Sequence, residues 1–275
     1  MSGTVAWQAG VPEDLRALAW RVFFTSRGRG ISLLHHVPWI DDATGTASVC
    51  ARAAHGLVGG LVVRRVPMAD GGQCGLVGLV CVDDAVRGLG WAHRLLEVAI
   101  AQAQQQGLAA LLLWTQKPEV YARHGFVCDG VERLGDVVPG LCEPAPLSGW
   151  VERPWPSGAE EVLPHLRRGM PAFARSARHL CVETVGGLAQ AIVLDTAGGP
   201  AVAEWQGDEE DVARLLVASL PGRWTCNAIE GDRLLEVLRH QGCTVQLRPT
   251  GTRFVRWLTP QTDRVLPTLR VLDRI

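Results

Sequence analysis

The sequence predicts a mixed α/β fold arranged as two tandem domains of related topology. Apolar, strand-like runs alternate with amphipathic, helix-like segments along the chain, which is typical of α/β proteins. A proline-rich stretch at 138–158 can continue neither a helix nor a central strand. The halves on either side repeat a similar order of elements, which favours a diverged internal duplication. We therefore expect domains at 1–143 and 158–275, joined by a linker at 144–157.

The first half opens with a helix and then alternates strands and helices. Pro12-Glu13-Asp14 is an acidic helix start, and the apolar residues after it have helical spacing. A second short helix is expected at 31–39, before the sheet begins. The expected strands, which read as alternating or continuously apolar runs, are 47–53, 57–66, 74–82, 108–114 and 126–128. Two later helices are expected at 88–106 and 118–125.

The second half repeats part of this order after the proline-rich stretch. Its expected strands are 188–194, 201–205, 223–227, 243–247 and 254–258. Its expected helices are 211–220 and 232–240, and each half has a short helix followed by a Gly-containing turn into a strand.

Composition excludes several classes of function. The 27 Lys and Arg against 28 Asp and Glu give a net charge of −1, so no strong field attracts nucleic acid or an anionic membrane. The longest apolar run, Leu108–Trp114, is far shorter than the ~20 residues of a membrane span. The first residues lack a basic and then apolar signal, so we expect a cytoplasmic protein. The eight cysteines have no C-x-x-C spacing, so we expect no metal and mostly buried thiols.

The segment from Leu79 to Ala92 carries the strongest chemical signal. It reads as a buried strand, a short turn, and an R-x-x-G-x-A sequence that opens a helix. The start of a helix has four free backbone N–H groups and the positive end of the helix dipole. Gly88 and Gly90 let an anion approach these groups, and Arg87 adds a cation. The segment is therefore suited to a pyrophosphate.

A second pattern follows this helix after one more strand. The only tyrosine in the chain stands four residues before a Gly-Phe pair. Together the two patterns resemble the GNAT acyltransferase superfamily over residues 5–135, most strongly over 76–128. The matching residues are Val82 at the strand end, Arg87, Gly90 and Ala92 in the turn, and Tyr121 before Gly125 and Phe126. The resemblance implies two tandem GNAT-like domains, of which the second is degenerate.

The resemblance also implies acetyl-CoA as the co-substrate and a direct transfer of its acetyl group to an amine. Backbone N–H groups near Cys81 or Val82 would polarise the thioester carbonyl. Tyr121 would protonate the leaving thiolate. The residues that would bind the cofactor are Val80, Cys81, Val82, Arg87, Gly88, Leu89, Gly90, Trp91 and Ala92.

The sequence departs from the family pattern in three places. Asp84 stands where a proline is often found, and Thr115-Gln116-Lys117 stands where an asparagine is common. The strand itself has no Glu or His to act as a general base. Asp83 and Asp84 are the nearest carboxylates, although such residues more often cap a turn, and deprotonation through water is the alternative.

Other candidate residues have both a functional and a structural interpretation. Cys81 lies where an acyl group is expected, but a core thiol is favoured because no partner residue is near it in sequence. The pair His35-His36 could line a substrate cleft or simply be solvent-exposed at a helix end. The pair Asp41-Asp42 could attract a cationic amine or cap a loop.

The second half is not expected to bind CoA. Its equivalent turn, Trp205 to Asp211, lacks Arg and carries four carboxylates that would repel a pyrophosphate. We expect an N-acetyltransferase acting on a primary amine of a small molecule, as a monomer or homodimer. Two alternatives remain: a protein or peptide N-acetyltransferase, and a non-catalytic module that binds acetyl-CoA.

Overall fold

The computed structural model divides the chain into two units, and each unit includes a segment from a distant part of the sequence: the end of a strand in unit 1 and a 3-10 turn in unit 2. The structure describes residues 3–28, 30–140, 147–155, 169–228, 232–260, 265–267 and 269–274. Unit 1 consists of residues 1–130, 252–269 and 274–275, and unit 2 consists of residues 131–251 and 270–273. This division differs from the expected domains at 1–143 and 158–275.

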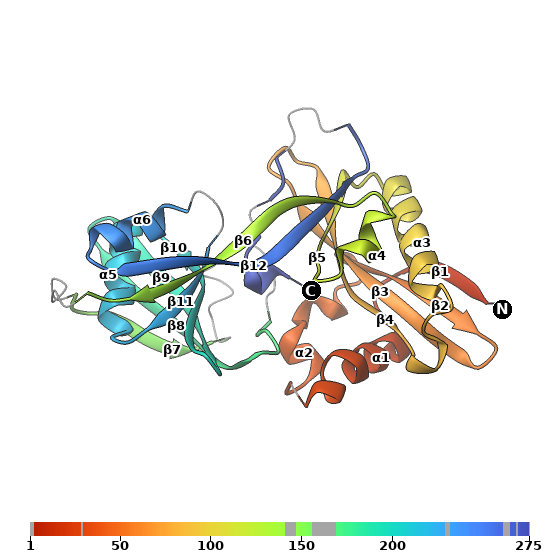
Figure 1. The fold of residues 1–275 in the computed structure, drawn as a ribbon, viewed down its shortest axis with the longest axis horizontal. Coiled ribbons are helices and arrows are strands. Elements are labelled where there is room, and N and C mark those ends of the chain that lie inside the picture. The colour runs from red at the N-terminus through yellow and green to blue at the C-terminus, as the bar shows by residue number, and fades with distance from the viewer. Residues whose placement is uncertain are drawn as a thin grey trace. The chain divides into compact units, whose positions relative to one another are not determined.

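Unit 1 has a mixed sheet with helices on both faces (Figure 1). Its elements are β1 (Thr4–Ala9), α1 (Glu13–Phe23), α2 (Leu33–His36), β2 (Thr46–Ala53), β3 (Gly56–Pro67), β4 (Gln73–Val82), α3 (Trp91–Gln105), β5 (Ala110–Trp114) and α4 (Pro118–Ala122). The strands β1 to β4 are antiparallel neighbours, and β4 and β5 are parallel. The strand β1 was not expected from the sequence.

Two hydrophobic clusters lie on opposite faces of the unit 1 sheet. The α3 cluster includes Val77, Leu95, Leu111 and Phe126, which are nearly inaccessible to solvent. The α1 cluster, on the other face, includes Leu15, Leu18, Ile40, Val62 and Cys81. The amphipathic spacing of α1 and α3 therefore buries one stripe of each helix against opposite faces of the same sheet.

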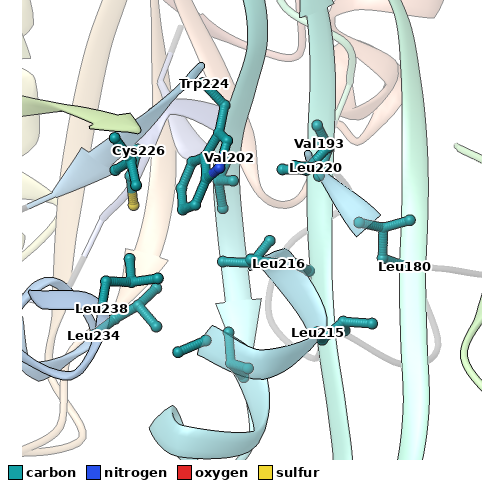
Figure 2. Close-up of a cluster of buried hydrophobic side chains, with 14 of the residues drawn as sticks. Leu180, Val193, Val202, Leu215, Leu216, Leu220, Trp224, Cys226, Leu234 and Leu238 are labelled. Carbon is teal, nitrogen blue, oxygen red and sulfur yellow. The ribbon is translucent and has the colours of Figure 1, made fainter. Parts of the chain in front are cut away.

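Unit 2 repeats the second part of this element order. Its elements are β7 (Val151–Pro154), β8 (Ala174–Thr184), β9 (Gly187–Thr196), β10 (Gly199–Gln206), α5 (Glu209–Ser219), β11 (Trp224–Ala228) and α6 (Arg233–His240). Strands β7 to β10 are antiparallel, and β10 pairs with β11 in parallel, as β4 does with β5. Figure 2 shows its core, where Leu215 and Leu216 of α5 and Leu234 and Leu238 of α6 lie with side chains of the sheet.

Two long strands each belong to both units. The strand β6 (Val127–Val138) starts in unit 1, and its part Arg133–Val137 pairs with β11 of unit 2. The strand β12 (Thr244–Trp257) starts in unit 2, and its part Arg253–Trp257 pairs with β5 of unit 1. The units therefore exchange strands.

The chain passes between the units within β6 and β12, and not through the proline-rich stretch. The expected linker at 144–157 is wrong for residues 151–154, which form β7 on the edge of β8. Proline is tolerated in a strand at a sheet edge, where the missing N–H has no ladder partner to bond. Residues 144–146 and 156–157 of the expected linker lie outside the described residues.

Candidate active site at the start of helix α3

The strand β4 contains a β-bulge just before its end. Its pairing with β3 steps from Val62–Gly78 to Gly60–Cys81, so two residues of β4 oppose one residue of β3. One of the two, Leu79, has φ of +48°, and no other non-glycine residue in the described part of the chain has a positive φ. A leucine in this conformation is strained, and such strain is concentrated at functional sites.

The bulge sorts the last side chains of β4 onto the two faces of the sheet. Cys81 packs into the α1 cluster, whereas Val80 and Val82 pack against the α3 cluster. Burial raises the pKa of the Cys81 thiol to about 12, so the thiolate needed for nucleophilic attack is scarce at neutral pH. The structure therefore supports the interpretation of Cys81 as a core thiol.

The edge of β4 beyond the bulge has no ladder with β5. The two strands pair at Gly75–Leu111 and Leu76–Leu112, and β4 then continues to Val82 without a further pair to β5. Along an antiparallel strand, alternate residues point their N–H and C=O groups away from the paired neighbour. These groups, on the side away from β3, are available to an extended ligand that lies along β4.

Helix α3 begins without a side-chain cap. Its N-cap residue is Gly90, with φ of +79°, and no side chain accepts a hydrogen bond from the first turn. Gly88 has φ of +77°, and a Cβ atom at either glycine would have no heavy atom within 4 Å. The loop is therefore open around both glycines, and the first N–H groups of α3 are left for an anion.

The charged residues before α3 are partly engaged with one another. Arg87 forms an exposed ion pair with Asp84 at 2.6 Å. Asp83 accepts a hydrogen bond from the Ala85 N–H and forms an ion pair with Arg21 at 2.5 Å. These contacts hold the pKa of its carboxyl below the usual value. A carboxylate with a lowered pKa is a weak proton acceptor at neutral pH. The geometry therefore favours the capping role of Asp83.

The remaining residues that were expected to bind the cofactor differ in how much of the side chain is exposed to solvent. The Leu89 side chain is about half exposed, and Ala92 is half-buried on the first turn of α3. The Trp91 side chain is 2% exposed and belongs to the α3 cluster, so this residue offers a ligand its backbone and not its ring.

Tyr121 lies on α4 and packs against the α3 cluster, together with Val80 and Val82. The structure thus brings the end of β4 and the only tyrosine to one cluster. The ring of Tyr121 meets Phe126 edge-on with centroids 6.0 Å apart. Burial raises the pKa of the phenol, and within the described residues its hydroxyl makes no hydrogen bond. The phenol is therefore protonated at neutral pH and has a proton to donate.

The remaining histidine and aspartate candidates from the sequence have structural contacts. His36 is buried, stacks on Phe24 with centroids 5.1 Å apart, and its Nε2 accepts a hydrogen bond from the Ile31 N–H at 3.0 Å. The solvent-exposed interpretation is therefore wrong for His36. Asp41 forms an ion pair with Arg16. Asp42 accepts hydrogen bonds from Thr44 and Gly45 in its loop, and these hold the pKa of its carboxyl below the usual value.

A pocket of about 510 Å³, which the sequence did not indicate, lies between α1 and residues 31–34. Its walls are mainly apolar and aromatic, and Glu13 and Arg16 supply charges. Arg16 already bonds Asp41 and two backbone carbonyls. Glu13 is exposed, and within the described residues it has no hydrogen bond or ion pair. The pocket-lining residues are Glu13, Arg16, Ala17, Trp20, Ile31, Ser32, Leu33, Leu34 and Ile40.

The described residues contain neither a candidate metal site nor a candidate membrane-spanning helix. In residues with described positions, no three His, Cys, Asp or Glu side chains are grouped as they would be around a metal ion. Across the same residues, no helix is long and apolar enough to span a bilayer. The seven cysteines in the described ranges are free thiols, and five of them are buried.

The bulged strand, the uncapped glycine-lined helix start and the tyrosine agree with the sequence family that matches the chain. The profile described as the acetyltransferase (GNAT) family matches residues 13–126. The chain therefore belongs to the GNAT acetyltransferase family and is an acyltransferase. Members of this family use acetyl-CoA.

Individual relatives cover one or both halves of the chain. A UPF0039 protein of Mycobacterium tuberculosis is 31% identical over 116 residues, which are 42% of this chain and 67% of the relative. A probable N-acyltransferase of Enterococcus faecalis has a TM-score of 0.67 at 12% identity, covering 94% of this chain and 73% of that one. A GCN5-related N-acetyltransferase of Anabaena variabilis has a TM-score of 0.66 at 12% identity, covering 93% and 73%.

A tandem GNAT protein from the clavulanic acid biosynthesis pathway extends the likeness to the whole of a solved chain. Its TM-score is 0.53 at 15% identity, and the match covers 94% of this chain and 100% of that one. The expected fold class, a mixed α/β GNAT fold with two tandem GNAT-like units, is confirmed.

Proposed function

We propose that this protein transfers the acetyl group of acetyl-CoA to a primary amine of a small molecule, with Tyr121 as the general acid. The observation that carries the proposal is the start of α3, where two open glycines of positive φ precede an uncapped helix. Such a helix start binds a phosphate group through backbone N–H groups. A capping side chain at the start of α3, or a Cβ atom at position 88 or 90, would obstruct a pyrophosphate; α3 has no such cap, and both positions are glycine.

Each part of the proposed site has one task. Acetyl-CoA supplies an acetyl thioester, whose carbonyl carbon is attacked by the amine with loss of the thiolate. The backbone of residues 87–92 binds the pyrophosphate, with Arg87 as a nearby cation. The free edge of β4 at Val80 to Val82 bonds the extended arm of the cofactor, and an N–H near Cys81 or Val82 polarises the carbonyl.

Tyr121 completes the reaction by giving its proton to the departing sulfur. Its raised pKa keeps the phenol protonated at neutral pH, and its hydroxyl is not consumed by a contact within the described residues. The amine loses a proton on attack. Because Asp83 is engaged as a cap, we propose that water accepts this proton.

The pocket beside α1 supports a small acceptor with an apolar body. Its walls include Trp20 and Ile40, and Glu13 offers an ammonium group a carboxylate that has no ion pair within the described residues. A cation near an aromatic ring gains a further attraction. The next residue after Trp20 on α1 is Arg21, which bonds Asp83 at the end of β4. This proximity along α1 favours the pocket as the site for the body of the acceptor.

The test is release of free CoA from acetyl-CoA in the presence of single acceptors. The panel contains arylalkyl amines, the matching uncharged alcohols, and short peptides with free N-termini. We expect turnover with the amines and none with the alcohols. Glu13→Gln should raise KM for the amine by about 10- to 100-fold, because a hydrogen bond to a charged group is worth roughly 1.5–3 kcal/mol.

A matched variant controls for the loss of a surface carboxylate. Glu236→Gln changes an exposed residue of α6 in unit 2 and should leave KM unaltered. Turnover with peptides and not with small amines would support a protein N-acetyltransferase instead. Binding of CoA without turnover of any acceptor would contradict the catalytic proposal and favour a non-catalytic module.

A further inference from the structure

Two histidines join α3 to the end of α4. The Nδ1 atom of His93 lies 3.1 Å from the Nε2 atom of His124, and the ring centroids are 4.7 Å apart. His93 is the third residue of α3, directly after the proposed pyrophosphate site. One of the two facing nitrogens must donate and the other must accept, so this hydrogen bond exists only while one of them lacks a proton.

His124 is fixed to the backbone that carries Tyr121. Its side chain is 6% exposed, and its backbone N–H donates to the Tyr121 carbonyl at 2.9 Å. Its own carbonyl accepts a hydrogen bond from the Arg256 guanidinium. The Phe126 N–H also donates to the Tyr121 carbonyl, at 3.4 Å. His124 and Tyr121 therefore belong to one hydrogen-bonded turn at the end of the five-residue helix α4.

The charges around the pair favour its neutral form at His124. Burial has the largest effect on the pKa of His124, and His93, Arg123 and Arg256 lower it further, while Glu97 raises it. Glu97 lies one turn along α3, with its Oε1 3.3 Å from the Nε2 of His93. The net result is a pKa for His124 below the usual histidine value.

The direction of the pH effect follows from this lowered pKa. The neutral form of His124 contributes its full stabilisation above the ordinary histidine pKa of ~6.5. That contribution is lost as the pH falls through the lower pKa of the folded state. When both rings carry protons on the facing nitrogens, two donors stand 3.1 Å apart and repel each other.

We propose that His93 and His124 are positioning residues whose hydrogen bond holds Tyr121 in place relative to the start of α3, and that double protonation of the pair releases it. The functional consequence rests on the proposed role of Tyr121 as the general acid. Turnover should then fall in mild acid through loss of position, while the phenol itself stays protonated. A displacement of about 1 Å at a catalytic group can cost ~100-fold in rate.

The single tyrosine provides a direct measurement of its position. In protein labelled with [13Cζ]tyrosine, one ring resonance reports Tyr121. Its own ionisation lies far above neutrality, because burial raises its pKa above 10. A chemical-shift step below the ordinary histidine pKa of ~6.5 therefore reports the titration of neighbouring groups, because the pKa of His124 is lowered. We expect such a step in the wild type.

Three variants identify the source of the step. His93→Gln changes a half-exposed ring, so the fold is retained, and it should remove the step. His124→Gln keeps hydrogen-bonding capacity without a titratable ring and should also remove it. His55→Gln, in the exposed turn between β2 and β3, is the matched control and should leave the step unchanged. No step in the wild type, or an unchanged step in His93→Gln, would overturn the inference.

Turnover separates this inference from the proposed function. The kcat of the wild type should fall as the pH decreases over the same range, and His93→Gln should have a flatter profile with kcat about tenfold lower at pH 7.5. If the NMR step disappears in His93→Gln but Tyr121→Phe keeps full turnover, the acid role is wrong and the structural coupling stands. If Tyr121→Phe abolishes turnover without any NMR step, the acid role stands and the coupling is wrong.

Discussion

Helices α3 and α5 follow the corresponding strands β4 and β10, yet their first turns have opposite chemistry. The N-cap residue of α3 is Gly90, which provides no side-chain cap, and a Cβ atom there would meet open space. The N-cap residue of α5 is Asp208, whose carboxylate accepts hydrogen bonds from the N–H groups of Glu210 and Asp211. The first N–H groups of α3 thus have no side-chain acceptor, whereas two N–H groups at the start of α5 bond the side chain of its own N-cap residue.

The strands before the two helices are alike, whereas the turns that follow them differ. Both have a bulge, at Leu79 in β4 and between Val202 and Glu204 in β10. The turn after β10 is tighter, because a Cβ atom at Gly207 would lie 2.6 Å from the Leu188 carbonyl oxygen. The two units therefore share the backbone scaffold of the fold, but an anion site also requires a helix start that is uncapped and open.

The largest expected effect comes from removing the end of β12, which belongs to unit 1 although the strand starts in unit 2. A chain that ends at Gly251 keeps every motif residue but loses Phe254 and Val255, which are buried beside β5. We expect unit 1 to lose cooperative unfolding and all activity, because β5 becomes an open edge with apolar surface. A chain that ends at Pro260 keeps β12 and is the control for unit 1. A folded, active 1–251 chain would contradict this dependence.

The next largest effect is expected at Tyr121, for which unit 2 has no counterpart. Tyr121→Phe retains the ring that packs on Phe126 and removes the hydroxyl. Turnover should fall by roughly 10²–10⁴-fold while CoA affinity and thermal stability change little. Steady-state kinetics at saturating acetyl-CoA, with chemistry as the rate-limiting step, gives the measurement. Activity within about threefold of the wild type would remove Tyr121 from the mechanism.

The open helix start can be closed by a single substitution. Gly90→Glu places a carboxylate at the pyrophosphate site and should weaken CoA binding by about 100-fold or more, as measured by calorimetry. Gly90→Gln has the same positive φ without the charge, so the difference between the two variants isolates the electrostatic effect. The wild type should bind one CoA per chain. Two CoA per chain, or a CoA affinity of Gly90→Glu equal to that of the wild type, would contradict the proposed difference between the starts of α3 and α5.

The smallest effect is expected at the cap of α5. Asp208→Ala should lower the free energy of unfolding by about 0.5–2 kcal/mol, because two N–H groups lose their acceptor. CoA affinity should not change, since Glu209, Glu210 and Asp211 keep this helix start acidic. Asp208→Asn preserves the cap and is the control in urea unfolding. A new CoA site in Asp208→Ala would show that the cap alone distinguishes the two units.

Local patterns in the sequence predicted most of the elements that carry the site. The expected strand 74–82 and helix 88–106 correspond to β4 and α3, with ends shifted by no more than three residues. The expected strands 243–247 and 254–258 are one strand, β12, which continues through Pro249 and Gly251. Those residues normally end a strand, but here they lie where β12 passes from unit 2 to unit 1. No local pattern encodes an exchange between units.

The site could be predicted only in part, because some of its contacts join residues that lie far apart in the sequence. Gly88, Gly90 and Tyr121 belong to contiguous motifs and could be identified by spacing. The contact between His93 and His124 joins residues 31 positions apart, and a single sequence carries no signal for it. The bulge at Leu79 was also missed, because nothing in an apolar run marks one residue for a positive φ.

The exchanged strands also determine when the protein can fold during synthesis. When residue 130 leaves the ribosome, unit 1 still lacks residues 252–269, about 120 residues later in the chain. At ~5–20 residues per second, the nascent chain waits for roughly 6–24 seconds with the edge of β5 unprotected. During that interval the edge of β5 is open to pairing with another chain, and slower translation lengthens this exposure until β12 is synthesised.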